Sequence, residues 1–242
     1  HMNDTQTSLK YFAGANTARG FVSFYDEIFG DLPSLDVIKG GSGTGKSRMM
    51  NDIASEAESR GFAVEKYYCS ADPESLDGVI VPALGYGMID GTAPHTRDPE
   101  IPGAVDRIIN LGDLWDPAVL RAGADGIRKL LSEKKTAFGA AFEALAAAGR
   151  FDCALKRMIS PALLPEKAAG AAERIAKKWD RNGTRGKIRT RMLDAFTMRG
   201  RTSLNTFADA AETVYLVSGR HGGASVFLSA MRDAAAERGY DV

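Results

Sequence analysis

The residues best suited to chemistry lie in one glycine-rich stretch, LDVIKGGSGTGKSRMM (35–50). Gly40 to Ser47 fits the spacing G-x-x-x-x-G-K-[ST], which lets backbone N–H groups surround the phosphates of a bound nucleotide. Glycines suit such a loop because they lack the Cβ that restricts other residues. The expected phosphate-contacting residues are Gly41, Ser42, Gly43, Thr44, Gly45, Lys46, Ser47 and Arg48.

Three of these side chains have distinct expected roles. Lys46 would reach the β- and γ-phosphates, and the Ser47 hydroxyl would hold Mg²⁺. Arg48 stands where many loops of this type carry a second Ser or Thr. Its guanidinium would either contact a phosphate or face solvent, and we favour solvent. The helix that begins near Lys46 would add the positive end of its dipole.

The flanking residues predict the elements that position the loop. Residues 35–39 form a short apolar run that is typical of a buried parallel strand. After the loop, apolar residues recur at helical spacing until Arg60-Gly61, which predicts a helix end. Residues 62–69 (FAVEKYYC) alternate like a second strand. This order of strand, loop, helix and strand favours a phosphate-binding loop over a chance match.

A carboxylate further along the chain is the second candidate. Residues 86–89 (YGMI) predict a short strand that ends at Asp90, which could hold Mg²⁺ or a Mg²⁺-bound water. We therefore assign catalysis to Lys46 and Asp90, and metal binding to Ser47 and Asp90. An ordinary Asp-Gly turn is the alternative for Asp90, and Asp72 is its rival for the metal.

The residues after Asp90 bear on the reaction. Gly91 stands where many ATP-hydrolysing proteins place a glutamate, which disfavours fast hydrolysis. His95 and Asp98 are candidates for handling a second substrate, although a lone histidine beside a proline is more often structural.

Residues 117–199 are rich in Ala, Leu, Lys and Arg at helical spacing. We expect one long amphipathic helix over 118–151, broken near Gly139, and a second over 165–179 (PEKAAGAAERIAKKW). Residues 174–201 are strongly basic. A solvated helix face is the favoured interpretation; a phosphate-facing lid with one catalytic arginine comes second, and nucleic-acid binding third.

The C-terminal stretch repeats the beginning of the chain. Residues 213–219 (TVYLVSG) align with 35–41, and 227–242 align with 49–64 without a gap. Ala224 falls at the position of Lys46 and His221 at that of Gly43, so this copy should not bind phosphate. We expect it to add a strand and a covering helix to the first sheet. The alternative is that it begins a second half of a longer protein.

Composition limits the classes of protein. The 242 residues are 44% hydrophobic and 26% charged with a formal net charge of +0, so charge favours neither nucleic acid nor membrane. No apolar run approaches the roughly 18 residues of a membrane helix. The beginning of the chain lacks the features of a signal peptide, and two lone cysteines, Cys69 and Cys153, give no disulfide framework. A cytoplasmic protein is expected.

Four blocks of sequence resemble a bacterial family of predicted P-loop ATPases whose members have two similar halves. The blocks are KGGSGTGKS, CSADPESLDGVIVPALG, MIDGTAPH and PGAVDRIINLGDLWD, and they occur in the same order within residues 10–118. The resemblance implies the fold and a nucleotide but no established reaction. It also favours Asp90, because DGTAPH is one of the matching blocks.

These observations predict an α/β P-loop NTPase fold with a mainly parallel sheet, helices on both faces and an α-helical insertion. The expected parts are a nucleotide-binding core (3–118), the insertion or lid (119–199) and the partial repeat (200–242). The expected function is Mg²⁺-dependent ATP binding with slow or partner-coupled hydrolysis. The alternatives are a small-molecule or nucleotide kinase and a non-catalytic nucleotide-binding module. The expected partners are a nucleoside triphosphate and either a small-molecule acceptor or a protein.

Overall fold

The computed structural model describes residues 8–92, 97–207, 211, 213–219 and 222–242. The chain forms two compact units, one made of His1–Glu143 with Arg191–Ala211 and the other of Ala144–Thr190 with Glu212–Val242. The expected boundaries after residues 118 and 199 do not coincide with those of the units.

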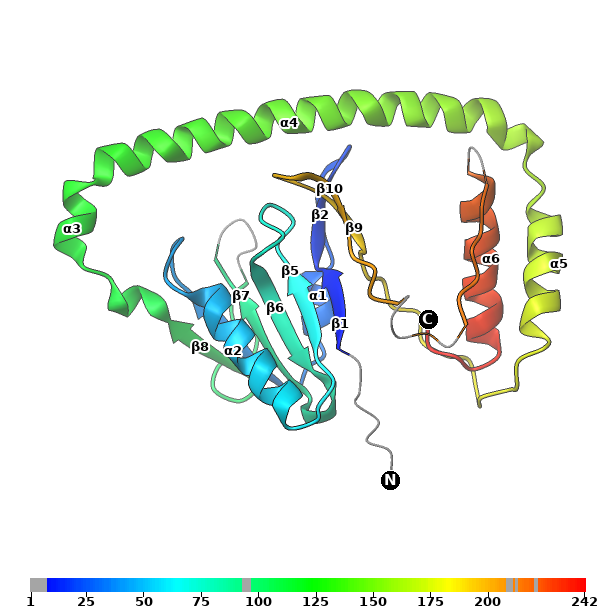
Figure 1. Cartoon of the computed structure of the whole chain (residues 1–242), viewed down its shortest axis with the longest axis horizontal. Helices are drawn as coiled ribbons and strands as arrows, with labels where there is room; N and C mark the ends of the chain where they lie inside the picture. Colours follow the sequence, from blue (N-terminus) through cyan, green and yellow to red (C-terminus); the bar gives the residue numbers. More distant parts are fainter. Residues whose placement is uncertain (1–7, 93–96, 208–210, 212, 220–221) are drawn as a thin grey trace. The chain divides into compact units, whose positions relative to one another are not determined.

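A six-stranded sheet forms the centre of the first unit, in the order β1-β5-β6-β7-β4-β8 (Figure 1). Neighbouring strands are parallel except where β6 pairs with β5 and β7. The mixed α/β architecture with a mostly parallel sheet agrees with expectation. The strands are β1 (Leu9–Phe12), β4 (Ser34–Lys39), β5 (Glu65–Tyr68), β6 (Leu76–Val81), β7 (Tyr86–Asp90) and β8 (Asp106–Asn110).

Successive side chains of the central strands are buried on opposite faces of the sheet, as the pleat requires. On one face, Val37 of β4 packs in a cluster with helix α1 (Tyr25–Phe29). On the other face, Ile38 packs in a cluster with Met50 and Ala54 of helix α2 (Lys46–Ser59). One helix therefore covers each face and fixes β4 between them, and the loop after β4 inherits that rigidity.

Two hairpins of the first unit share one turn geometry. In the first, Thr17 Oγ1 donates to Gly20 O at 2.8 Å and accepts from Arg19 N at 3.1 Å. In the second, Thr197 makes the equivalent bonds at 3.0 and 3.1 Å. The two hairpins therefore repeat one arrangement of a threonine and a glycine. The hairpin strands are β2 (Gly14–Thr17), β3 (Gly20–Ser23), β9 (Asp194–Thr197) and β10 (Gly200–Ser203).

The helix expected over 118–151 forms as two helices, a short α3 (Pro117–Ala122) and the long α4, so the chain breaks at Gly123 and not at Gly139. Helix α4 runs without interruption from Ala124 to Ile159. One glycine costs a helix about 1 kcal/mol relative to alanine, and the strong helix formers around it outweigh that penalty. The elements leading to α3 are η1 (Pro82–Leu84) and η2 (Leu111–Leu114).

The second unit centres on a pair of helices that follow η3 (Ser160–Ala162): α5 (Pro165–Ala176) and α6 (Gly223–Glu237). They pack through small residues, Ala172, Ala176 and Ala236, which are fully buried. Helix α6 ends as α2 does, with an arginine cap followed by a glycine at positive φ: 84° at Gly61 and 91° at Gly239. The end of the aligned helix therefore repeats as the sequence predicted.

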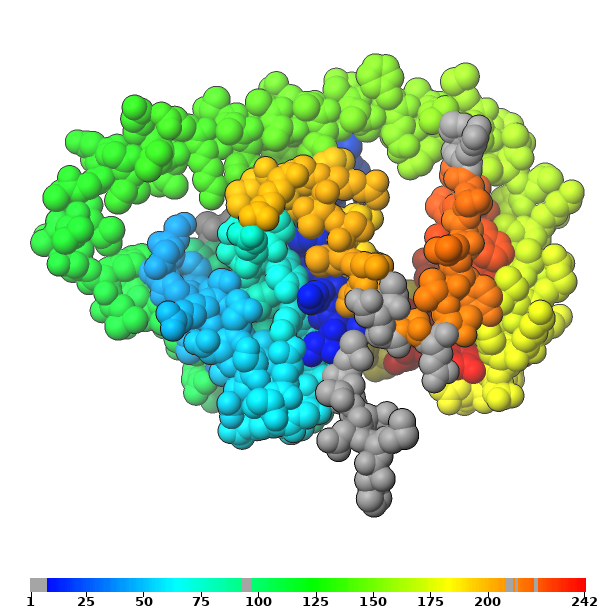
Figure 2. Space-filling model, viewed as in Figure 1, coloured from blue at the N-terminus to red at the C-terminus, as the bar shows by residue number. Residues whose placement is uncertain are grey.

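The strand expected over 213–219 does not form. These residues have no regular secondary structure, and Leu216 is 94% exposed. Figure 2 shows the segment (orange) on the surface of the second unit. Its counterpart β4 is held by ladders to β7 and β8, whereas the central sheet includes no strand from 213–219. An apolar pattern alone does not make a strand when no neighbouring backbone pairs with it.

Candidate functional site

The glycine-rich loop connects β4 to α2, as the sequence predicted. Gly43 and Gly45 have φ of 80° and 90°, in the left-handed region that favours glycine. Gly45 is the N-cap of α2 and has no side chain that could cap the N–H groups of the first helical turn. Those N–H groups and the helix dipole thus remain able to bind an anion.

Lys46 lies across the loop rather than out in solvent. Its ammonium donates to the carbonyl oxygens of Gly40 and Gly41, both at 2.8 Å, and lies 3.6 Å from Asp90 Oδ2. The side chains of Lys46 and Asp90 are only 12% and 18% exposed. The structure therefore brings together the two residues to which the sequence assigned catalysis.

Asp90 occupies the carboxyl end of β7, where it pairs in register with Ile38 of β4. Its Oδ1 accepts from Thr92 N at 2.8 Å, and Thr92 Oγ1 in turn donates to Gly40 O at 2.9 Å. These bonds tie the segment after β7 to the loop. Asp90 does form an Asp-Gly turn, but the turn aims the carboxylate at Lys46.

Ser47, the other expected metal ligand, lies at the start of α2. Its Oγ accepts from Leu76 N at 2.9 Å and from Asn51 Nδ2 at 3.4 Å, so a metal would replace the longer of these two bonds. Among the described residues no group of three or more His, Cys, Asp or Glu side chains could hold a metal. A Mg²⁺ ion that keeps several waters and binds phosphate oxygens needs only one or two protein carboxylates. Ser47 and Asp90 are compatible with such an ion.

Asp72, the rival of Asp90 for the metal, and Asp98, a candidate for handling a second substrate, both bond to residues outside the loop. Asp72 accepts from Ser75 Oγ at 2.7 Å and from Glu74 N at 3.2 Å, so it closes the turn before β6. Asp98 pairs with Lys39 at 3.0 Å and its side chain is 90% exposed. His95 lies outside the described residues.

Arg48 points away from the loop, as we favoured. Its side chain is 87% exposed and its Nε lies 4.0 Å from Asp52 Oδ2, one helical turn along α2.

The loop also touches an aromatic residue that sequence reasoning missed. A Cβ on Gly41 would lie 2.9 Å from Cζ2 of Trp115, so the indole ring approaches the loop backbone closely. Trp115 follows η2 and is 45% exposed. The signal that could have identified Trp115 was its position shortly after β8, the strand that pairs with β4.

A buried carboxylate, Asp77, is the second residue that the sequence analysis did not identify. It lies on β6 with 7% exposure, and the Tyr25 hydroxyl donates to its Oδ2 at 2.9 Å. Burial raises the pKa of the Asp77 carboxyl from 3.8 to about 6, against the hydrogen bonds from Tyr25 and Cys69, which lower it. The signal for Asp77 in the sequence was an aspartate inside the otherwise apolar run LDGVIV (76–81).

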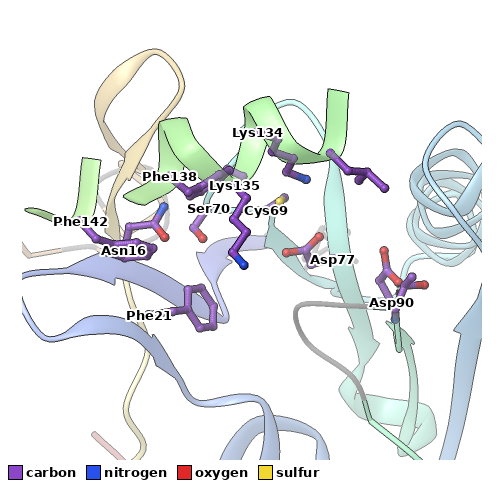
Figure 3. A pocket seen from close by; sticks show the side chains of 13 residues that line it. Asn16, Phe21, Cys69, Ser70, Asp77, Asp90, Lys134, Lys135, Phe138 and Phe142 are labelled. Atoms are coloured by element: carbon purple, nitrogen blue, oxygen red, sulfur yellow. Dashed lines mark hydrogen bonds between the residues drawn. The ribbon is translucent and has the colours of Figure 1, made fainter. Parts of the chain in front are cut away.

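Asp77 and Asp90 line one cavity of about 520 Å³ within the first unit (Figure 3). The central sheet and the β2–β3 hairpin supply one side of the lining, and one face of α4 supplies the other. The lining residues are Asn16, Phe21, Cys69, Ser70, Ala71, Asp77, Asp90, Thr92, Leu131, Lys134, Lys135, Phe138 and Phe142.

The basic stretch 174–201 is divided between the two units. Arg199 and Arg201 of the first unit pair with Glu74 at 2.6 Å and Asp194 at 3.2 Å. In the second unit, Arg185 pairs with Glu237 at 3.0 Å. These pairs support the solvated, ion-paired interpretation for the residues concerned.

The aligned position in the second unit lacks the lysine of a phosphate site, although a glycine at positive φ, Gly222, precedes α6 as Gly45 precedes α2. Ala224 supplies no ammonium, and His221 lies outside the described residues. A cavity of about 670 Å³ lies beside Ala224, and its side chains are mostly apolar, including Leu216, Phe227 and Met231.

Comparison of the chain with protein-family models, with curated proteins and with solved structures finds no match. Within the part of the chain that the structure describes, no helix combines the length and apolarity that a membrane span requires.

Proposed function

We propose that the first unit binds Mg²⁺–ATP at the loop between β4 and α2 and slowly hydrolyses its terminal phosphoanhydride bond. One observation carries the proposal: Lys46 bridges the carbonyl oxygens of Gly40 and Gly41 and faces Asp90, at the carboxyl ends of adjacent parallel strands. Ligands of open α/β sheets bind at these ends. The uncapped N-terminus of α2 adds backbone donors at the same place.

Lys46 would exchange its two carbonyl partners for oxygens of the β- and γ-phosphates. The exchange is favourable because a phosphate oxygen is charged, and charge-assisted hydrogen bonds are about twice as strong as neutral ones. The separation of 3.6 Å from Asp90 is longer than a hydrogen bond. Lys46 is therefore free to turn towards a phosphate without breaking a direct bond to that carboxylate.

Ser47 and Asp90 would hold the metal, Ser47 directly and Asp90 directly or through water. Bound Mg²⁺ supplies charge neutralisation at the β- and γ-oxygens. Asp90 is already oriented for this role by Thr92 N. Hydrolysis should be slow because Gly91 follows Asp90 and supplies no carboxylate to orient water.

A thermal melt tests the proposal on the unaltered protein. At an ATP concentration about 100-fold above Kd, binding should stabilise the first unit by about 2.7 kcal/mol. For a chain of this size that corresponds to an increase in Tm of about 5–10 °C. The increase should require Mg²⁺ for its full size. No change in Tm with ATP or GTP, with or without Mg²⁺, would contradict nucleotide binding.

Phosphoryl transfer to a small molecule is the second candidate function. The observation that favours it is the cavity beside Asp90, which a simple hydrolase does not need. Turnover separates the three candidates: ADP release without an acceptor favours hydrolysis, and acceptor-dependent release favours a kinase. Binding without turnover favours a nucleotide-binding module.

A further inference from the structure

The cavity that Asp77 and Asp90 line has the size of a metabolite site. Its volume of about 520 Å³ lies within the range of about 300–1,000 Å³ typical of small-molecule pockets. Thr92, which also lines it, bonds to the glycine loop through Gly40 O at 2.9 Å. The cavity is thus continuous with the segment that positions Asp90, and an occupant would lie next to the expected phosphate site.

The helical side of the cavity is one face of α4, because its residues recur three or four positions apart. Lys134 lies over the Phe138 ring at 5.8 Å from the centroid, and the Phe138 and Phe142 rings lie 6.3 Å apart. All three residues are on the part of α4 that belongs to the first unit. This face offers aromatic surface together with positive charge.

The charges on the two sides of the cavity are opposite in sign. Lys134 and Lys135 come from α4, and Asp77 and Asp90 come from β6 and β7. In Figure 3 the ammonium group of Lys135 and the carboxyl group of Asp77 point toward the same space. A ligand that satisfies both sides needs an anionic group for the lysines and a hydrogen-bond donor for a carboxylate. Its remaining body would contact the phenylalanine rings.

We propose that this cavity is an acceptor site for a small organic anion that carries an apolar body and a hydroxyl group, and that this hydroxyl receives the γ-phosphoryl group of ATP. The proposal rests on the nucleotide site proposed above and names the second substrate of that site. Lys134 and Lys135 would bind the anionic group, and Phe21 and Phe138 would contact the apolar body.

Phosphoryl transfer replaces one phosphorus–oxygen bond with another and moves one proton to the protein. The acceptor oxygen forms a bond to the γ-phosphorus while the bond from that phosphorus to the β–γ bridging oxygen breaks. The electron pair of the broken bond leaves with ADP, and the hydroxyl proton passes to the Asp77 carboxylate. The products are the phosphate monoester of the acceptor, ADP and protonated Asp77, which releases its proton to solvent.

Asp77 suits the role of general base in position and in proton affinity. The Tyr25 hydroxyl donates to its Oδ2, which holds the carboxyl group in one orientation. Burial raises its pKa to about 6, near the value at which a base is both ionised and able to accept a proton at neutral pH. Asp90 then remains available to the metal, so the two carboxylates of the cavity have separate tasks.

The test uses the full chain, [γ-³²P]ATP with Mg²⁺, and the deproteinised small-molecule fraction of a bacterial extract as the source of acceptors. The readout is a labelled organic phosphate that separates from orthophosphate and ATP by anion exchange. Four variants are compared with the unaltered protein: Asp77→Asn, the double variant Lys134→Ala/Lys135→Ala, Lys46→Ala, and Lys129→Ala. Lys129 is the matched control, because it lies on α4, pairs with Glu133 at 3.9 Å and does not line the cavity. Calorimetry with ATP accompanies each variant.

We expect a labelled product from the unaltered protein and from Lys129→Ala, and none from Lys46→Ala. Asp77→Asn should lower its rate at least about 100-fold, the usual contribution of a general base, while ATP affinity stays within twofold. The double lysine variant should lower the rate at least about fivefold at dilute extract, and a higher extract concentration should restore it. Label found only in orthophosphate would overturn the acceptor site and leave the nucleotide site intact. A product formed equally by the cavity variants would also overturn it. Failure of the unaltered protein to bind ATP would refute the proposed function itself.

Discussion

Replacing Asp77 with asparagine should stabilise the unliganded protein at neutral pH, although the residue is buried and hydrogen-bonded. The pKa of Asp77 is raised from 3.8 to about 6 in the folded protein, chiefly by burial. Because the folded value is the higher one, ionisation opposes folding. The penalty is absent below about pH 3.8, grows between pH 3.8 and 6 and is complete above pH 6. At 1.36 kcal/mol for each pKa unit, the difference of about 2.2 corresponds to about 3 kcal/mol.

Asparagine keeps the carboxyl group's shape and an oxygen that can accept from Tyr25, but it carries no charge. The groups that act on the ionised form are Tyr25, Cys69, Asp90 and Lys46. Asp77→Asn should therefore exceed the unaltered protein in free energy of unfolding by about 3 kcal/mol at pH 7.5. The gap should shrink to about 1 kcal/mol at pH 4.5, where most of the penalty has gone.

Urea unfolding in EDTA without nucleotide measures this difference, with Trp115 fluorescence as the reporter of the first unit. A Trp179→Phe background removes the only other tryptophan, which lies in the second unit. The slope with urea should match between variants, so that the midpoints report stability alone. A variant that is less stable at pH 7.5, or a gap that does not change with pH, would refute the reasoning.

Three further predictions concern the nucleotide site. Asp90→Asn should lower turnover at least tenfold more than it lowers ATP affinity, and Mn²⁺ should partly restore turnover. Asp72→Asn should keep turnover within about twofold of the unaltered protein. The reverse pattern in steady-state kinetics would assign the metal to Asp72. Gly41→Ala should displace the Trp115 ring, because the new Cβ would lie 2.9 Å from its Cζ2, and unchanged Trp115 emission would count against that contact. Ala224→Lys should leave the calorimetric stoichiometry at one ATP per chain, and a second bound ATP would show the aligned copy to be competent.

Local sequence patterns predicted the elements around the glycine loop because each depends on residues next to one another. The strand β4, the helix α2 and the strand ending at Asp90 are all present with their boundaries nearly as expected. The meeting of Lys46 and Asp90 followed from the rule that parallel strands end at one edge of a sheet. The roles of these residues stay predictions.

Features that depend on distant residues could not be predicted. Asp77 is buried because Tyr25, 52 positions away, covers it and bonds to it. The antiparallel strand β6 lies in a stretch whose turn formers dominated the pattern. Lys134 and Lys135 lie on the long amphipathic helix that the sequence predicted, but only the fold places that helix over the cavity. The segment 213–219 has the apolar sequence of a strand, but it pairs with no strand of the central sheet.

The central claim, that the loop from Gly40 to Ser47 binds ATP, is tested most directly by calorimetric titration of Mg²⁺–ATP into the unaltered protein, Lys46→Ala and Arg48→Ala. Arg48 is the matched control, because it is the next residue on α2 and its side chain is 87% exposed. The unaltered protein and Arg48→Ala should bind one ATP per chain with affinities within about twofold. Lys46→Ala should bind about 10- to 150-fold more weakly, since a charged hydrogen bond contributes about 1.5–3 kcal/mol. Equal affinity in all three proteins, or no binding by the unaltered one, would contradict the account.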